Sequence, residues 1–203
     1  MGMGQLELKL AAVERYMESA HRAEINDYWA RLTRKSCSLI KYEDVASRLH
    51  IRQQIPAGHQ MVLLNNIVGS VGRYREYTRG FYPRRAVLQE RWVMVDVTLN
   101  SMRGLPPVEL YKVGEAYFVI DGNHRISVAR ANENKDIEAV VIECQTNVPL
   151  TVEDFTTGKW LIKAAYSDFM AQTKLDQLRP AAHWHVSHAE HYETLLQHVA
   201  VHR

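Results

Sequence analysis

The stretch from Tyr117 to Arg130 constrains the fold more than any other part of this 203-residue chain. It begins with an apolar, β-prone run that ends at Ile120 and continues with Asp121 and Gly122, which are turn-forming residue types. From about Asn123 the apolar side chains recur at the spacing of a helix. The pattern predicts a strand, a tight turn and a helix in direct succession.

This junction predicts an anion site. The first N–H groups of a helix have no acceptor within the helix, and the helix dipole adds partial positive charge to them. His124 and Arg125 add side-chain donors at the same end, and a guanidinium can hold a phosphate with two parallel hydrogen bonds. In the alternative interpretation Asp121 is only a helix cap, Gly122 only a turn residue, and the two basic residues are solvated.

The order Asp-Gly-Asn-His-Arg-x-x-x-Ala-Arg from Asp121 to Arg130, with a strand pattern on either side, resembles the ParB/sulfiredoxin superfamily. A second stretch, Met61 to Arg75, resembles the entry strand of ParB-like domains and the arginine-bearing loop that follows it. The resemblance covers about Met61 to Glu143. It implies an α+β fold with a small mixed sheet and packed helices, here extended by N- and C-terminal helical segments.

The resemblance also implies a ligand, because this turn holds nucleotide phosphates in that superfamily. We expect ATP, ADP or CTP with Mg²⁺, and NTPase or small-molecule kinase chemistry in which Asp121 and His124 have catalytic roles. The expected ligand contacts are Gly69, Ser70, Arg73, Arg75, Gly122, Asn123, His124, Arg125 and Ser127.

Sulfiredoxin-type repair is excluded by one residue. Family members with that activity carry a reactive cysteine in the turn, where this chain has Asn123, and Cys37 and Cys144 lie far from it in the sequence. Chromosome-partitioning ParB proteins have a Gly-Glu-Arg-Arg type of turn and a helix-turn-helix domain, and the sequence shows no clear counterpart of either. The turn is closer to that of the free-serine kinases of the superfamily.

An arginine-rich segment from Arg73 to Arg91 favours a competing function. Its arginines alternate with aromatic residues, which is typical of a surface that contacts DNA phosphates and stacks on bases, although an ordinary solvated face has the same pattern. The formal net charge of only +2 does not decide between them. The arginines are Arg73, Arg75, Arg79, Arg84, Arg85 and Arg91.

Periodicity predicts the remaining elements. We expect domain boundaries that separate residues 1–58, 59–145 and 146–203, and a homodimer formed through the helical extensions. The predicted helices are Gln5 to Leu32, Tyr42 to Leu49, Ala86 to Leu99 and Phe155 to Met170; the predicted strands are Val108 to Val113, Ala116 to Ile120 and Ile137 to Glu143; Gln53 to Gln60 is predicted as a loop, and Asn132 or Asn134 as a left-handed helix cap.

Cysteine usage predicts a cytoplasmic protein, and the C-terminal histidines form either a surface helix or, as the alternative, a transition-metal site. Two cysteines are too few for a disulfide framework, and no apolar run is long enough to cross a membrane. The C-terminal histidines match no established zinc spacing, so we expect a surface helix there. These histidines are His183, His185, His188, His191, His198 and His202.

Overall fold

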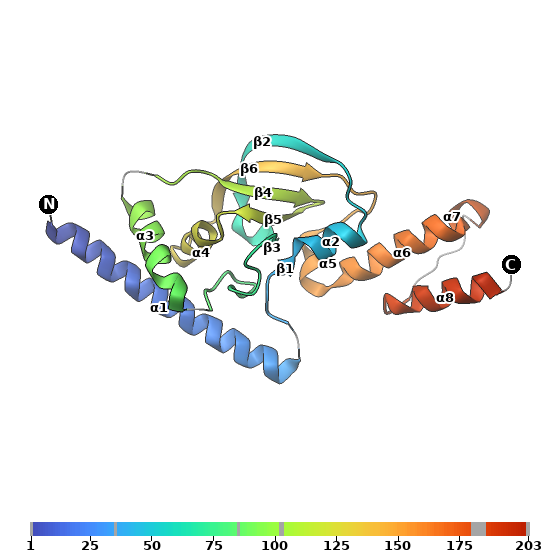
Figure 1. Cartoon of the computed structure of the whole chain (residues 1–203), viewed down its shortest axis with the longest axis horizontal. Helices are drawn as coiled ribbons and strands as arrows, with labels where there is room; N and C mark the ends of the chain where they lie inside the picture. The colour runs from blue at the N-terminus through green and yellow to red at the C-terminus, as the bar shows by residue number, and fades with distance from the viewer. Residues whose placement is uncertain (1, 35, 85, 102–103, 180–185, 202–203) are drawn as a thin grey trace.

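The computed structural model describes residues 2–34, 36–84, 86–101, 104–179 and 186–201, and within them six strands form one mixed sheet (Figure 1). Their order across the sheet is β1-β3-β5-β4-β6-β2. Pairing is parallel for β1 with β3, β3 with β5 and β4 with β6, and antiparallel for β4 with β5 and β2 with β6. The strands are β1 Ile40–Lys41, β2 Gln54–Leu63, β3 Ile67–Ser70, β4 Val108–Val113, β5 Ala116–Asp121 and β6 Asp136–Cys144.

Helices cover both faces of this sheet, which confirms the predicted α+β class (Figure 1). Alternate residues of a strand point to opposite faces. Val119 accordingly packs with Ile126 of α4, whereas Phe118 packs with Phe155 of α5 and Trp160 of α6. The helices are α1 Gly2–Thr33, α2 Tyr42–Arg48, α3 Gln89–Asn100, α4 Asn123–Ala131, α5 Val152–Thr157, α6 Lys159–Thr173, α7 Leu175–Leu178 and α8 Glu190–Val201, with 3₁₀ turns η1 Leu64–Asn66 and η2 Ala86–Leu88.

The prediction of a loop from Gln53 to Gln60 is wrong, because β2 occupies all of these residues except Gln53 and pairs with β6. Pro56 and Gly58, which suggested a loop, lie where the register with β6 shifts. A β-bulge on an edge strand tolerates proline, since the missing N–H leaves no gap in a central ladder. The domain boundary predicted after residue 58 therefore lies inside a strand. The elements β1 and α2, which precede this boundary, also pack with the sheet.

Two further predictions fail at helix ends. The helix predicted from Phe155 to Met170 is interrupted at Gly158, whose φ of 83° ends α5 before α6 begins. After α4 the left-handed position is taken by Glu133, with φ 59°, and not by Asn132 or Asn134. No described helix is long and apolar enough to cross a membrane.

A third layer joins α1 to α3 and thereby supports α4. Tyr16 of α1 lies edge-on to Trp92 of α3, with 5.5 Å between ring centroids, and the Trp92 indole N–H donates to Ser127 Oγ of α4 at 2.8 Å. Arg15 also pairs with the fully buried Asp96 of α3. Helix α4, which carries the predicted anion site, thus contacts the sheet through Ile126 and α3 through Ser127.

Candidate functional site

The predicted strand, turn and helix are present as β5, Gly122 and α4. Gly122 is the residue before the helix, with φ 115°, a conformation that favours glycine. A Cβ at this position would lie 2.6 Å from Cγ1 of Val108 on β4. No side chain caps the helix, so Asp121 does not have the capping role that was one interpretation of it. The first turn of α4 keeps its N–H groups for another acceptor.

A cavity of about 370 Å³ opens at this helix end. It carries more positive than negative groups, because Asp121 is the only acidic residue among the described residues that line it. Arg91 of α3 has no ion-pair partner within the described part of the chain, and Arg73 pairs only loosely with Glu76, at 3.5 Å. The lining residues are Gly72, Arg73, Arg91, Val95, Leu105, Pro106, Ile120, Asp121, Gly122, Asn123, His124 and Arg125.

Two buried side chains at the start of α4 have polar atoms without a partner in the described structure. Asn123 and His124 are each 7% exposed, and the unpartnered atoms are Asn123 Oδ1 and His124 Nε2. The other ring nitrogen, Nδ1, lies 3.0 Å from the hydroxyl of Tyr77. Burial raises the pKa of Tyr77, so the phenol keeps its proton and we assign it as the donor to Nδ1. Nε2 then carries a hydrogen that has no acceptor.

Arg125 has a structural role that the sequence did not predict. Its guanidinium donates to the carbonyl oxygens of Pro106 and Pro107, at 2.7 and 2.6 Å, and to the carboxylate of Asp121 one helical turn earlier. These contacts hold the 104–107 segment against the helix end. The side chain lines the cavity, but its donors are largely engaged before any ligand binds.

Four predicted ligand contacts lie outside this cavity. Gly69 is packed between β1 and β5, where a Cβ would meet the carbonyl oxygen of Ile40 and the ring of Phe118. The hydroxyl of Ser70 donates to the carbonyl oxygens of Gly72 and Val119. The other two are Ser127, which is bonded to Trp92, and Arg75, which faces a different cavity.

The arginine-rich segment does not form one continuous surface. Arg73 and Arg91 line the cavity at α4, whereas Arg75 and Arg79 line a separate cavity of about 870 Å³ beside α5 and α6. Arg84 is mostly buried and pairs with Asp27 of α1. Arg85 lies outside the described residues.

Sequence reasoning missed two residues as members of the site. Arg91 was noted only as part of the basic segment, although it stands four positions before Val95 on the same helical face, and both line the cavity. Tyr77 was noted only as an aromatic residue, and no local pattern indicated that its hydroxyl would reach His124 across 47 residues of sequence.

We expect the fold to lose stability as the pH falls from 6.5 toward 4. Burial lowers the pKa of His124 to about 4, assisted by the charges of Arg91 and Arg73, whereas the ordinary value is 6.5. Between these values the unfolded chain binds a proton that the folded chain does not, so the free energy of unfolding decreases as the pH falls, by up to about 3 kcal/mol. Urea unfolding across this range, for the wild type and His124→Gln, measures the effect. Equal pH slopes for the two proteins would contradict it.

No group of three or more His, Cys, Asp or Glu side chains that could hold a metal ion occurs among the described residues. The rings of His188 and His191 lie edge to face, with 5.4 Å between their centroids, close to the start of α8. The predicted surface helix is present as α8, which packs on α6 through Tyr192 and Phe169. His183, His185 and His202 lie outside the described residues.

No family model matches the sequence, and no curated protein matches it. Among the solved structures that match is sulfiredoxin from Arabidopsis thaliana, with a TM-score of 0.32 and 16% identity over 51% of this chain and 96% of that chain. Another is the C-terminally truncated chromosome-partitioning protein ParB from Caulobacter crescentus complexed with CTP-gamma-S, with a TM-score of 0.32 and 14% identity over 59% of this chain and 66% of that chain.

Proposed function

We propose that the cavity at the start of α4 binds the phosphate groups of a nucleoside di- or triphosphate. The observation that supports this most directly is the uncapped helix end, which opens into a cavity lined by Arg73 and Arg91. Free N–H groups, the helix dipole and two guanidinium groups all favour an anion at the same place. Because the other described arginines of the segment, Arg75, Arg79 and Arg84, lie elsewhere, the arrangement suits a compact anion better than an extended nucleic-acid backbone.

The unpartnered buried atoms favour a nucleotide over inorganic phosphate. His124 Nε2 offers a donor, which suits a phosphate oxygen, whereas Asn123 Oδ1 is an acceptor and would repel one. An acceptor there requires a hydroxyl or N–H group on the ligand. A nucleotide carries both kinds of group, since its ribose hydroxyls accompany its phosphates.

Magnesium fits this site only as a companion of the nucleotide. Mg²⁺ is commonly held by one or two carboxylates together with substrate phosphates. Asp121 supplies the single carboxylate among the described lining residues, and its side chain is 69% exposed. Asp121 would therefore hold an ion that arrives with the phosphates, and the ion would supply charge neutralisation.

The residues present suit phosphoryl transfer, in the form of NTPase or small-molecule kinase activity. Such chemistry depends mainly on positioning and on neutralisation of charge, which Arg73, Arg91 and the helix end would provide. His124 is neutral at neutral pH, because its pKa is about 4 in the folded chain, so it would act as a hydrogen-bonding group that Tyr77 orients. Arg125 already engages one oxygen of Asp121, so this carboxylate would either hold the ion or orient the attacking group, and we assign it the first role.

We expect Arg91→Ala and Arg73→Ala each to weaken nucleotide binding by about tenfold or more, since each removes a charge-assisted contact to phosphate. Calorimetric titration of ATP, ADP, CTP and GTP with Mg²⁺ into the wild type and each variant measures the affinity. Arg75→Ala is the matched control, because it removes the same charge from the same segment but outside the cavity. The proposal fails if no nucleotide saturates the wild type, or if Arg75→Ala weakens binding as much as the other two.

A further inference from the structure

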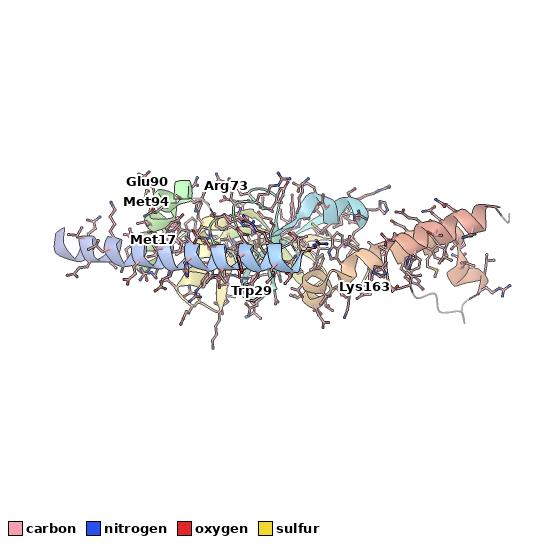
Figure 2. All side chains as sticks on the ribbon, turned by 90° about the horizontal axis from the view of Figure 1, so that it is seen from below. Met17, Trp29, Arg73, Glu90, Met94 and Lys163 are labelled. Atoms are coloured by element: carbon pink, nitrogen blue, oxygen red, sulfur yellow. The ribbon has the colours of Figure 1, made fainter. Side chains whose placement is uncertain are left out.

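The longest helix carries an apolar stripe that nothing in the described chain covers. The side chains of the stripe are exposed by more than half, although they are among the largest hydrophobic residues of α1. They are Leu6 at 59%, Leu10 at 62%, Met17 at 60%, Tyr28 at 65% and Leu32 at 64%. Figure 2 shows α1 in front of the rest of the chain when the molecule is seen from below, with Met17 and Trp29 on this outer side.

The stripe lies opposite the face that α1 packs on the protein. The buried positions Ala12, Tyr16, Ser19 and Ala23 follow at steps of three and four, and Ala12 and Tyr16 pack with Trp92 and Val93 of α3. At 100° per residue the stripe lies roughly 150° around the helix from that row. Core packing therefore explains one face of α1 and leaves the stripe without a structural reason.

The stripe repeats every eleven residues. Leu6, Met17 and Tyr28 form one row, and Leu10 and Leu32 belong to a second row whose middle member is His21. An eleven-residue repeat corresponds to about 3.67 residues per turn, close to the natural period of an α-helix, so the rows run nearly straight along α1. A straight apolar row is the pattern that a second, similar helix can pack against.

We infer that α1 is the interface with a second copy of this chain, and that the two helices pair antiparallel about the level of Ser19. In that register Leu6 of one copy lies opposite Leu32 of the other, Leu10 opposite Tyr28, and Met17 opposite His21. Every apolar member of the stripe meets a stripe position of the other helix. The two-fold symmetry of a closed dimer requires this self-complementarity.

The charges of α1 favour the same orientation. Two of its charged residues are already paired within the chain, Arg15 with Asp96 and Asp27 with Arg84. Among the others, the first half of the helix has three glutamates against one lysine, whereas the second half has two arginines against one glutamate. Antiparallel pairing about Ser19 brings Glu7 to the level of Arg31 and Glu14 to the level of Glu24, whereas parallel pairing brings each charged residue to the level of its own copy. The remaining charged residues are Glu7, Lys9, Glu14 and Glu18, then Arg22, Glu24 and Arg31.

The first test measures the mass of the full chain by light scattering on a sizing column. We expect twice the monomer mass of 23.4 kDa for the wild type, and loss of the dimer in Leu10→Glu with an unchanged circular dichroism spectrum. Leu178→Glu is the matched control, because Leu178 is 68% exposed but lies on α7. A monomeric wild type, or a folded Leu10→Glu that stays dimeric, would overturn the inference.

The second test measures orientation by oxidative cross-linking. Met17→Cys and His21→Cys lie opposite one another in the antiparallel register, so a mixture of the two variants should cross-link far more than either alone. A parallel dimer would instead cross-link Met17→Cys with itself, which excludes the proposed orientation. The wild type under the same conditions controls for Cys37 and Cys144, and neither test depends on nucleotide binding.

Discussion

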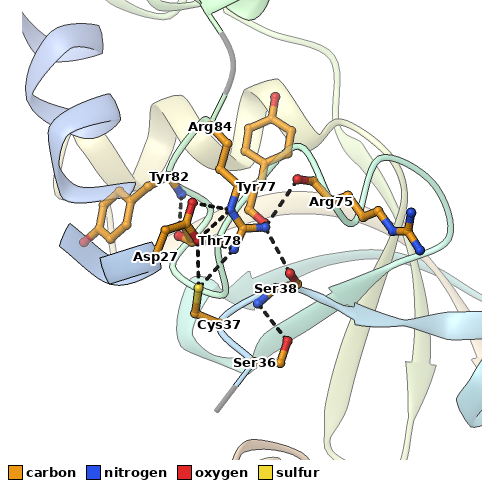
Figure 3. A network of polar contacts seen from close by, with 9 residues as sticks. All are labelled: Asp27, Ser36, Cys37, Ser38, Arg75, Tyr77, Thr78, Tyr82 and Arg84. Atoms are coloured by element: carbon orange, nitrogen blue, oxygen red, sulfur yellow. Dashed lines mark hydrogen bonds and ion pairs between the residues drawn. The ribbon is translucent and has the colours of Figure 1, made fainter. Parts of the chain in front are cut away.

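Replacement of Arg84 by methionine is expected to lower the free energy of unfolding by about 3 kcal/mol, as estimated from the cost of breaking a largely buried ion pair. Figure 3 shows the guanidinium at the centre of a polar network that joins α1 to the 36–38 and 75–84 segments. It contacts both carboxylate oxygens of Asp27 and donates to Ser38 Oγ at 3.0 Å and to the Tyr77 carbonyl oxygen at 2.9 Å. Methionine fills much of the volume but satisfies none of these acceptors.

The partner of Arg84 makes the loss larger than that of one hydrogen bond. Burial alone would raise the pKa of Asp27, but hydrogen bonds from Arg84 and Cys37 lower it below its ordinary value. Without Arg84 the carboxylate keeps only the weak thiol donor, at 3.0 Å, and the other acceptors lose theirs. The affected carbonyl groups belong to the loop that also carries Arg73, so the loop is expected to loosen at the cavity.

Urea unfolding of Arg84→Met and of the control Arg75→Met measures this effect. Arg75 is exposed, and its guanidinium lies over the ring of Tyr74, 5.6 Å from the centroid, so its replacement should change stability by well under about 1 kcal/mol. The double variant Asp27→Leu/Arg84→Met should recover part of the loss, because it removes both charges together. Similar losses for Arg84→Met and Arg75→Met would show that the network does not stabilise the fold.

The elements that the sequence predicted well are those whose pattern is local. The run from Tyr117 to Ile120, the turn and the helix after it depend on neighbouring residues, and they are present as β5, Gly122 and α4. The helix from Gln5 to Leu32 likewise follows from its periodicity. By contrast, β2 could not be recognised from Pro56 and Gly58, because its position at the edge of the sheet is a property of the whole topology.

The candidate site could be predicted only in part, for the same physical reason. Proximity in sequence places Asn123 and His124 at the helix end, but it does not decide which arginine faces them. Arg73 and Arg75 are neighbours in the chain and line different cavities, whereas Arg91 comes from α3 and joins Arg73. Arg84, in the middle of the same segment, is used to hold α1. Which of these arginines lines which cavity depends on tertiary packing, and the spacing of residues in the sequence does not determine it.

Gly122→Ala is expected to lower the free energy of unfolding by about 3 kcal/mol and to abolish nucleotide binding at the proposed site. The backbone φ of 115° is unfavourable for any residue with a Cβ, and the added methyl group would lie 2.6 Å from Val108 Cγ1 and 3.0 Å from Val108 Cβ. Backbone strain and overpacking each cost about 1–3 kcal/mol. Relief of either requires the turn to move, and this movement reorients the first N–H groups of α4.

Urea unfolding and calorimetric titration of the same samples separate the two effects. Gly158→Ala is the matched control, because its φ of 83° imposes similar strain while a Cβ there meets no atom within 4 Å. It should cost only about 1–2 kcal/mol and leave nucleotide affinity unchanged. Gly122→Ala should cost less when added to Val108→Ala than when added to the wild type, since the smaller side chain removes the clash. Unchanged nucleotide affinity in a folded Gly122→Ala would mean that the ligand does not depend on the start of α4, which is the feature that carries the proposed function.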